Sequence, residues 1–334
     1  MTAPAAERRG AGALLTAWSR LKPDRRRGLY ALLAAIVVFA VGNVLQPGFA
    51  GGEGIATVLT VASFVGLVAA GQTFVVLVGG IDLSVPWMLN SAAVLLATAS
   101  AGSNARAWWA VPLVLVAGLA AGAVNGMGVA FLSVPAVVMT LGMNGVLQGL
   151  TLGLTGGFTC ATCSSAAPSA VGTAVSGRVF GVPGQVIIWV VVAILVTIVL
   201  SWTTFGRRVY AIGNNARASH LSAVNVRAVT VTLYALSGLF AALAGLLLMA
   251  YGGKATLGMG DPYLFQSIAA VVIGGVYILG GRGHYLGSAA GAVTLTALVS
   301  VLLAKNMPDY GRDIVYGVTV LVILLLYGRA EPES

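Results

Sequence analysis

Long apolar runs separated by short polar stretches fill most of the chain. A helix needs about 20 apolar residues to cross the hydrocarbon core of a bilayer. Ten runs approach or reach this length, at residues 29–45, 54–78, 86–100, 110–132, 136–155, 186–202, 229–251, 263–279, 285–304 and 314–327. The pattern predicts an all-α integral membrane protein with about ten transmembrane helices. Its shortest runs, 86–100 and 314–327, are candidates for half-helices or re-entrant segments.

Composition and charge agree with this assignment. Hydrophobic residues make up 58% of the chain and charged residues 8%, with a mean hydropathy of +0.96; soluble domains carry about 25% charged residues. If the N-terminus lies in the cytoplasm, thirteen of the eighteen Lys and Arg residues fall on the cytoplasmic side, which predicts that both termini are cytoplasmic. The net charge of +9 is then explained by topology, with membrane lipids as counter-ions, and gives no support for a nucleic-acid partner.

The predicted organisation is one transmembrane domain, residues 29–328, between two cytoplasmic tails. In the N-terminal tail, residues 1–28, the segment 10–21 carries Leu14, Leu15, Trp18 and Leu21 and is either an interfacial helix or a disordered stretch. Residues 329–334 form the second tail. The longest polar interruption, residues 205–227, contains four arginines and His220, and its position predicts a cytoplasmic loop that either docks on a soluble partner or is simply solvated.

Glycine spacing predicts close helix packing. Three triplets recur at intervals of four residues: Gly118, Gly122 and Gly126; Gly145, Gly149 and Gly153; Gly283, Gly287 and Gly291. Such spacing places the glycines on one helix face, where neighbouring backbones can approach. Two apolar runs also break in similar ways, at VLVGGIDLSV (76–85) and VVIGGVYILGGRG (271–283), which indicates two pseudo-repeated halves.

Several kinds of chemistry have no support in the sequence. The pair Gly253-Lys254 is followed by Ala255, so the chain has no phosphate-binding G-x-x-x-x-G-K-[ST] motif. His220 and His284 lie in separate loops, and no group of residues has metal-ligand spacing or forms a catalytic cluster. Cys160 and Cys163 form a C-x-x-C in a predicted outer loop, where a local disulfide, free thiols or a redox or metal role all remain open. We therefore expect a protein that is not an enzyme, with no catalytic residue and no metal.

Four motifs, in order, resemble those of bacterial ABC sugar-importer permeases of the ribose, xylose and galactose branch. They are VVLVGGIDLSVP (75–86), AVNGMGVAFLSVPAVVMTLGMNGVLQGL (123–150), FGRRVYAIGNNARASHLSAVNVR (205–227) and SIAAVVIGGVYILGGRGHYLGSAAGA (267–292). Pro86 and Ala223 stand where this family usually has glycine, which leaves the sugar undefined.

The resemblance implies a type II, ten-helix permease subunit in the bacterial cytoplasmic (inner) membrane that imports a monosaccharide, a pentose or hexose. It would act with a second permease copy or close homologue, cytoplasmic ABC ATPase subunits and an extracytoplasmic sugar-binding protein. ATP and Mg would bind the ATPase, and this chain would bind no cofactor. Two alternatives remain: a branched-chain amino-acid ABC permease of the same superfamily, and an ion-coupled secondary transporter, for which only Asp82 offers a buried carboxyl group.

Site residues are expected in three groups. The segment that couples to the ATPase would contain Arg207, Gly213, Asn214, Asn215, Arg217, Ala218, Ser219 and Leu221. A sugar path needs hydrogen-bonding side chains inside the bundle, and the candidates are Gln72, Thr73, Asn90, Asn125, Thr140, Asn144, Gln148 and Gln266. Asp82 lies in the first break, where it would cap a helix together with Ser84, pair with Arg282 as a gate, or carry a proton.

Overall fold

The computed structural model describes residues 23–157, 166–308, 310–311, 314–318 and 321. Four predictions fall wholly or mostly outside these residues: the interfacial helix at 10–21, the state of Cys160 and Cys163, the C-terminal tail, and the last span at 314–327. The other nine predicted spans all overlap helices, and six helices in the described part are long and apolar enough to cross a membrane. The all-α membrane fold is confirmed.

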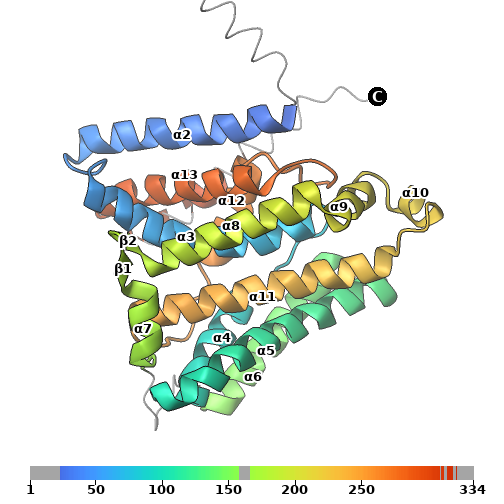
Figure 1. Ribbon diagram of the computed structural model, residues 1–334, viewed down its shortest axis with the longest axis horizontal. Coiled ribbons are helices and arrows are strands. Elements are labelled where there is room, and N and C mark those ends of the chain that lie inside the picture. Colours follow the sequence, from blue (N-terminus) through green and yellow to red (C-terminus); the bar gives the residue numbers. More distant parts are fainter. Residues whose placement is uncertain (1–22, 158–165, 309, 312–313, 319–320, 322–334) are drawn as a thin grey trace, which may run out of the picture.

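The helices lie side by side in layers (Figure 1). Helix α2 (Pro23–Leu45) packs on α13 (Tyr285–Ala304), which in turn packs on α12 (Tyr263–Ile273) and α3 (Gly52–Val76). Helix α11 (Val226–Gly252) is central and contacts α3, α4 (Val85–Ser100) and α5 (Asn104–Phe131), while α8 (Gly184–Trp202) lies against α3 and α6 (Ala136–Thr155) against α4 and α5.

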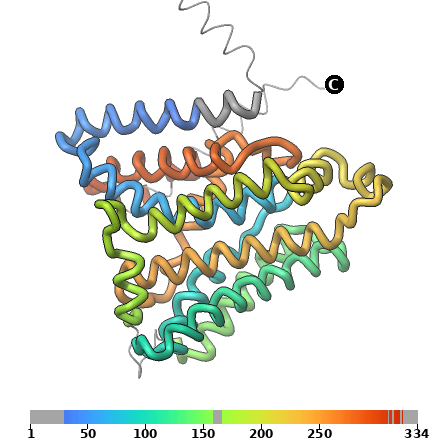
Figure 2. The backbone as a smooth tube through the Cα atoms, in the orientation of Figure 1, coloured from blue at the N-terminus to red at the C-terminus, as the bar shows by residue number. Residues whose placement is uncertain are grey.

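Short elements gather at the two opposite ends of the bundle (Figure 2). One end, the hairpin rim, carries α7 (Ser169–Ser176) and the two-stranded hairpin β1 (Arg178–Val179) and β2 (Val182–Pro183). There, Arg178 forms a salt bridge of 2.8 Å with Glu53, at the start of α3. The other end, the α9–α10 rim, carries α9 (Thr204–Asn214) and α10 (Ala216–Leu221). The predicted alternation of spans assigns these same segments to opposite sides of the membrane.

Burial differs sharply between helices. In α3 and α11, 67% and 72% of the most apolar window is buried, whereas α6 buries only 11%. Leu67, Phe74, Leu233 and Leu247 are among the fully buried side chains of the core. The core is therefore built around α3 and α11, and α6 leaves most of its surface open.

The glycine triplets lie in two different packing environments. A Cβ atom at Gly126 would lie 2.6 Å from the Cα atom of Val231, and Gly118 and Gly122 face α11 in the same way, so the predicted close packing of α5 is confirmed. Gly287 and Gly291 of α13 likewise abut the backbone of α12 and its end. The triplet of α6 differs, because a Cβ at Gly145, Gly149 or Gly153 would meet no atom of another described element within 4 Å. Within this chain the prediction of a packed seam on α6 is wrong.

Candidate functional site

Both predicted helix breaks are present. Helix α3 ends at Val76, and residues 77–84 lead to α4; helix α12 ends at Ile273, six residues before the end of the predicted span, and residues 274–284 lead to α13. Gly79 and Gly275 lie near the start of the two breaks and have positive φ angles, +79° and +82°. Glycine occupies these positions because a positive φ is strained for residues with a Cβ. The breaks touch each other, since the N–H of Gly281 donates to the carbonyl of Leu77 at 2.8 Å.

Asp82 is the centre of a buried polar cluster in the first break. Its side chain has no exposed surface. Oδ1 accepts hydrogen bonds from the N–H of Ser84 at 3.0 Å and from the Ser84 hydroxyl, and Oδ2 accepts from the hydroxyl of Ser237, on α11, at 2.7 Å. Gln72 of α3 holds the backbone of the same residue, because its Nε2 donates to the Asp82 carbonyl at 2.6 Å and its Oε1 accepts from the Asp82 N–H at 3.3 Å.

This geometry distinguishes the proposed roles of Asp82. The carboxyl group binds the N–H of Ser84, the residue that precedes the first turn of α4, which is close to the capping role. Ser84 itself makes no side-chain cap; its hydroxyl donates to Asp82 and accepts from Asn125 Nδ2 at 2.9 Å. The ion pair with Arg282 does not form in the described structure, because Arg282 is exposed while Asp82 is enclosed by Ser84 and Ser237.

The predicted path residues separate into distinct environments. Gln72, Asn125, Thr140 and Asn144 surround the first break; Thr140 Oγ1 lies 3.4 Å from the carbonyl of Ile81, and Asn144 Oδ1 accepts from the N–H of Trp87 at 3.3 Å. The others lie apart from this group: Thr73 donates to Ser288 of α13, Gln266 donates to Tyr316, Asn90 is buried with no hydrogen-bond partner among the described residues, and Gln148 is exposed on α6.

The segment 205–227 is folded, as two short helices with side-chain caps. The hydroxyl of Thr203 accepts from the N–H of Gly206 at the start of α9, and Asn215 Oδ1 accepts from the N–H of Ala218 at the start of α10. Most of the predicted coupling residues, including Arg207, Asn214, Asn215, Arg217 and Ala218, are exposed, and Leu221 is 82% exposed despite being apolar. Gly213 is half-buried, and Ser219 is buried and presents no docking surface.

The end of α9 contacts both helix breaks. A Cβ atom at Gly213 would overlap the carbonyl of Leu77 and the N–H of Gly281, so only glycine allows this approach. Asn214 Nδ2 lies 3.4 Å from the carbonyl of Gly281. Tyr210, one turn earlier, donates its hydroxyl to the carbonyl of Gly283 at 2.8 Å. The end of α9 is therefore in direct contact with residues of both breaks.

Two of these residues were not identified from the sequence. Ser237 lies in an apolar helix with no motif around it, although its spacing from the buried Leu233 and Ala241 places it on the inward face of α11. Tyr210 lies inside the FGRRVYAIG motif, where its aromatic ring gave no reason to prefer a hydrogen bond to a distant loop over simple packing.

Comparison with known proteins assigns the family. The profile of the family described as "Branched-chain amino acid transport system / permease component" matches residues 54–324, which include both breaks and the segment between α8 and α11. The chain belongs to this family. It is 34% identical over 300 residues to the ribose import permease protein RbsC of Escherichia coli K12, covering 90% of this chain and 93% of that protein.

Two further relatives have similar coverage. The ribose import permease protein RbsC of Haemophilus influenzae is 31% identical over 293 residues, or 88% of this chain and 90% of that protein. The autoinducer 2 import system permease protein LsrC of E. coli DH10B is 32% identical over 310 residues, or 92% of this chain and 88% of that protein. No solved structure matches the chain.

Proposed function

We propose that this chain is the transmembrane subunit of an ATP-driven importer that moves a monosaccharide, a pentose or hexose, across the bacterial cytoplasmic membrane. The observation that carries the proposal is the similarity to ribose import permeases over nine-tenths of the chain. The three relatives described above are named as import permeases for ribose or autoinducer 2, so the sugar function is preferred to the amino-acid alternative.

The α9–α10 rim is proposed to face the cytoplasm and to dock the partner ATPase, which holds ATP and Mg. The exposed Leu221 and Arg217 of α10 offer an apolar anchor and a charge for this contact. When the ATPase closes, α10 moves and α9 moves with it. Because Gly213 contacts both breaks and Tyr210 bonds to the second, the movement reaches α3–α4 and α12–α13 together. The hairpin rim would then receive the sugar from the extracytoplasmic binding protein.

A second permease copy or close homologue is proposed to cover α6. This helix is apolar, is mostly unburied, and carries Gly145, Gly149 and Gly153 on an open face. Helices associate in membranes through small residues that allow backbones to approach. The half-buried Asn144 and exposed Gln148 of α6 would then lie near the boundary between the two subunits, where an uncharged sugar finds hydrogen-bonding groups.

The experiment is uptake into proteoliposomes that contain the chain, with the ATPase and the binding protein encoded nearest to its gene. We expect labelled ribose or another monosaccharide to accumulate only when ATP and both partners are present. Accumulation of leucine but of no sugar would favour the amino-acid permease. Sugar accumulation driven by a proton gradient without ATP would favour a secondary transporter.

A further inference from the structure

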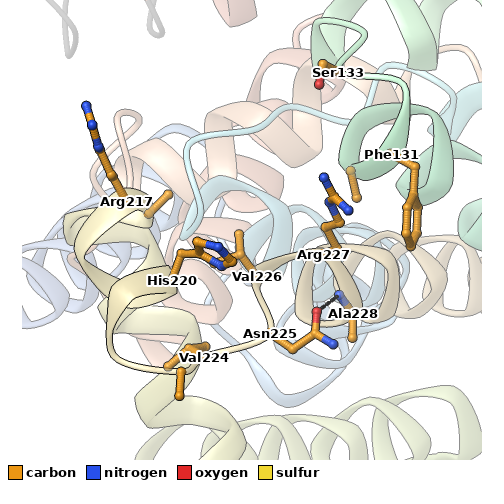
Figure 3. Close-up of a pocket in the computed structure, with 12 residues that line it drawn as sticks. Phe131, Ser133, Arg217, His220, Val224, Asn225, Val226, Arg227 and Ala228 are labelled. Atoms are coloured by element: carbon orange, nitrogen blue, oxygen red, sulfur yellow. Dashed lines mark hydrogen bonds between the residues drawn. The ribbon is translucent and has the colours of Figure 1, made fainter.

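A groove of about 900 Å³ lies at the α9–α10 rim, between the end of α5, helix α10 and the start of α11. Residues from all three helices and their connecting loops line it, among them Phe131, Ser133, Arg217, His220, Asn225 and Arg227. In Figure 3 the His220 ring projects from α10 toward Val226, Arg227 extends beside Phe131, and Arg217 extends from α10 at the edge of the group. Asn225 is engaged as the cap of α11, since its Oδ1 accepts from the N–H of Ala228 at 3.0 Å.

The residues that line the groove make it basic. Arg217, His220 and Arg227 all line it, and none of its lining residues is acidic. The sequence contains no Asp or Glu between Asp82 and Asp261, so α5, α6 and α8 to α11 carry no acidic side chain. The ion pair between Arg178 and Glu53 lies at the hairpin rim, away from the groove. The groove therefore has guanidinium donors that favour a phosphate ligand.

One edge of the same groove is apolar. Phe131, the last residue of α5, lines the groove and is 57% exposed, and the next residue, Leu132, is 74% exposed. The Phe131 ring lies 5.6 Å from Cζ of Arg227, so a large apolar side chain and a cation stand next to each other. Both α5 and α11 are long enough to span a bilayer, and the groove lies where one ends and the other begins. This is the depth at which lipid headgroups meet acyl chains, and where basic and aromatic side chains gather.

We propose that this groove binds the phosphate of an anionic phospholipid from the inner leaflet. The phosphate lies between Arg227 and His220, and the acyl chains pass over Phe131 and Leu132. Bound in this way, the lipid bridges α10 to α5 and α11 and supports the docking helix from the membrane side. The inner-leaflet assignment rests on the orientation proposed above; binding of an anionic phospholipid does not.

The test measures lipid bound to the purified chain in neutral detergent, with no ATPase and no transport. Tritiated phosphatidylglycerol or phosphatidylcholine is added, and the lipid that elutes with the protein is counted. We expect phosphatidylglycerol to be retained in preference to phosphatidylcholine. Arg227→Gln should weaken phosphatidylglycerol binding about five-fold, the effect expected for removing one basic residue near anionic lipid. Arg208→Gln, at another exposed arginine, in α9 outside the groove, is the matched control and should bind normally.

Replacement variants and a competition with inorganic phosphate complete the test. If Arg227→Gln does not elute as a single folded species, His220→Gln and Arg227→Lys replace it, with weakened binding expected for the first and nearly full binding for the second. Equal binding of phosphatidylglycerol by wild type and groove variants, or no preference over phosphatidylcholine, would overturn the proposal. Displacement of phosphatidylglycerol by inorganic phosphate at equal concentration would assign the groove to a soluble phosphate instead. Because transport is not measured, this outcome is independent of the importer function.

Discussion

Replacement of Asp82 tests the buried cluster in the first break. The carboxyl group accepts three hydrogen bonds, two from Ser84 and one from Ser237. Asp82→Ala removes all three acceptor contacts while the donors stay inside the bundle. Asp82→Asn keeps an oxygen for Ser84, and its amide can donate to the Ser237 hydroxyl, which both donates and accepts.

The hydrogen bonds of Asp82 set the expected difference in stability between Asp82→Ala and Asp82→Asn. A buried donor that loses its acceptor costs about 1–3 kcal/mol. Two of the three donors are hydroxyls, which can rotate toward other acceptors, but the N–H of Ser84 cannot. We therefore expect Asp82→Ala to lower the free energy of unfolding by about 3 kcal/mol, and Asp82→Asn by about 1 kcal/mol or less. The bonds from Gln72 go to the backbone of residue 82 and survive both changes.

The assay is thermal unfolding in detergent, followed by the loss of the monodisperse peak in size exclusion. Asp261→Asn serves as a control for loss of an acidic side chain, because Asp261 is exposed in the loop before α12. The expected order of melting temperatures is wild type, then Asp82→Asn close below, then Asp82→Ala well below. If Asn destabilised as much as Ala, the negative charge itself would be required, and the hydrogen-bonding account would be refuted. Rescue of Asp82→Arg by Arg282→Asp would instead restore the gate pair that this conformation lacks.

Three other predictions follow from packing and exposure. Gly122→Leu should lower the melting temperature, since its side chain would meet the backbone of Tyr234 and Ala235 and overpacking costs about 1–3 kcal/mol or more. Gly149→Leu lies on the open face of α6. It should leave the isolated chain's melting temperature unchanged but reduce chemical cross-linking between two copies. Normal cross-linking of Gly149→Leu would place this face against lipid. Leu221→Asp and Arg217→Glu should fold normally but co-purify poorly with the ATPase, because they add negative charge to the exposed face of α10; normal co-purification would move the docking site elsewhere. Finally, the chain alone in liposomes should neither hydrolyse ATP nor accumulate sugar, because it has no nucleotide-binding motif. Activity of either kind would contradict the proposed function.

The sequence predicted the parts of the fold that depend on apolar length and backbone freedom. The spans were found because a bilayer demands long apolar runs, and the breaks because Gly-Gly pairs interrupt such runs at 79–80 and 274–275. The ends of helices were less accurate. Helix α5 begins at Asn104, six residues before the predicted span, because polar residues at a rim can still be helical.

Contacts between distant segments could not be predicted. Glycine spacing alone did not distinguish Gly122, which faces α11, from Gly149, which faces open space, because the period of four gives a face but no neighbour. Among the path candidates, Thr73 follows Gln72 directly, yet successive residues of a helix point about 100° apart, so Thr73 faces Ser288 while Gln72 faces the first break. The link from Tyr210 to Gly283 spans 73 residues and carries no local signal.

The central claim is that α9 transmits movement to both breaks, and one hydroxyl group tests it most directly. Tyr210→Phe removes only the oxygen that donates to the carbonyl of Gly283. Tyr251→Phe, at the end of α11 far from α9 and α10, is the matched control. The measurement is the number of sugar molecules imported per ATP hydrolysed in proteoliposomes with the partner ATPase and binding protein. The account predicts that this ratio falls in Tyr210→Phe, with normal folding and normal co-purification of the ATPase, and stays at the wild-type value in Tyr251→Phe. A wild-type ratio in Tyr210→Phe, or an equal fall in both variants, would contradict it.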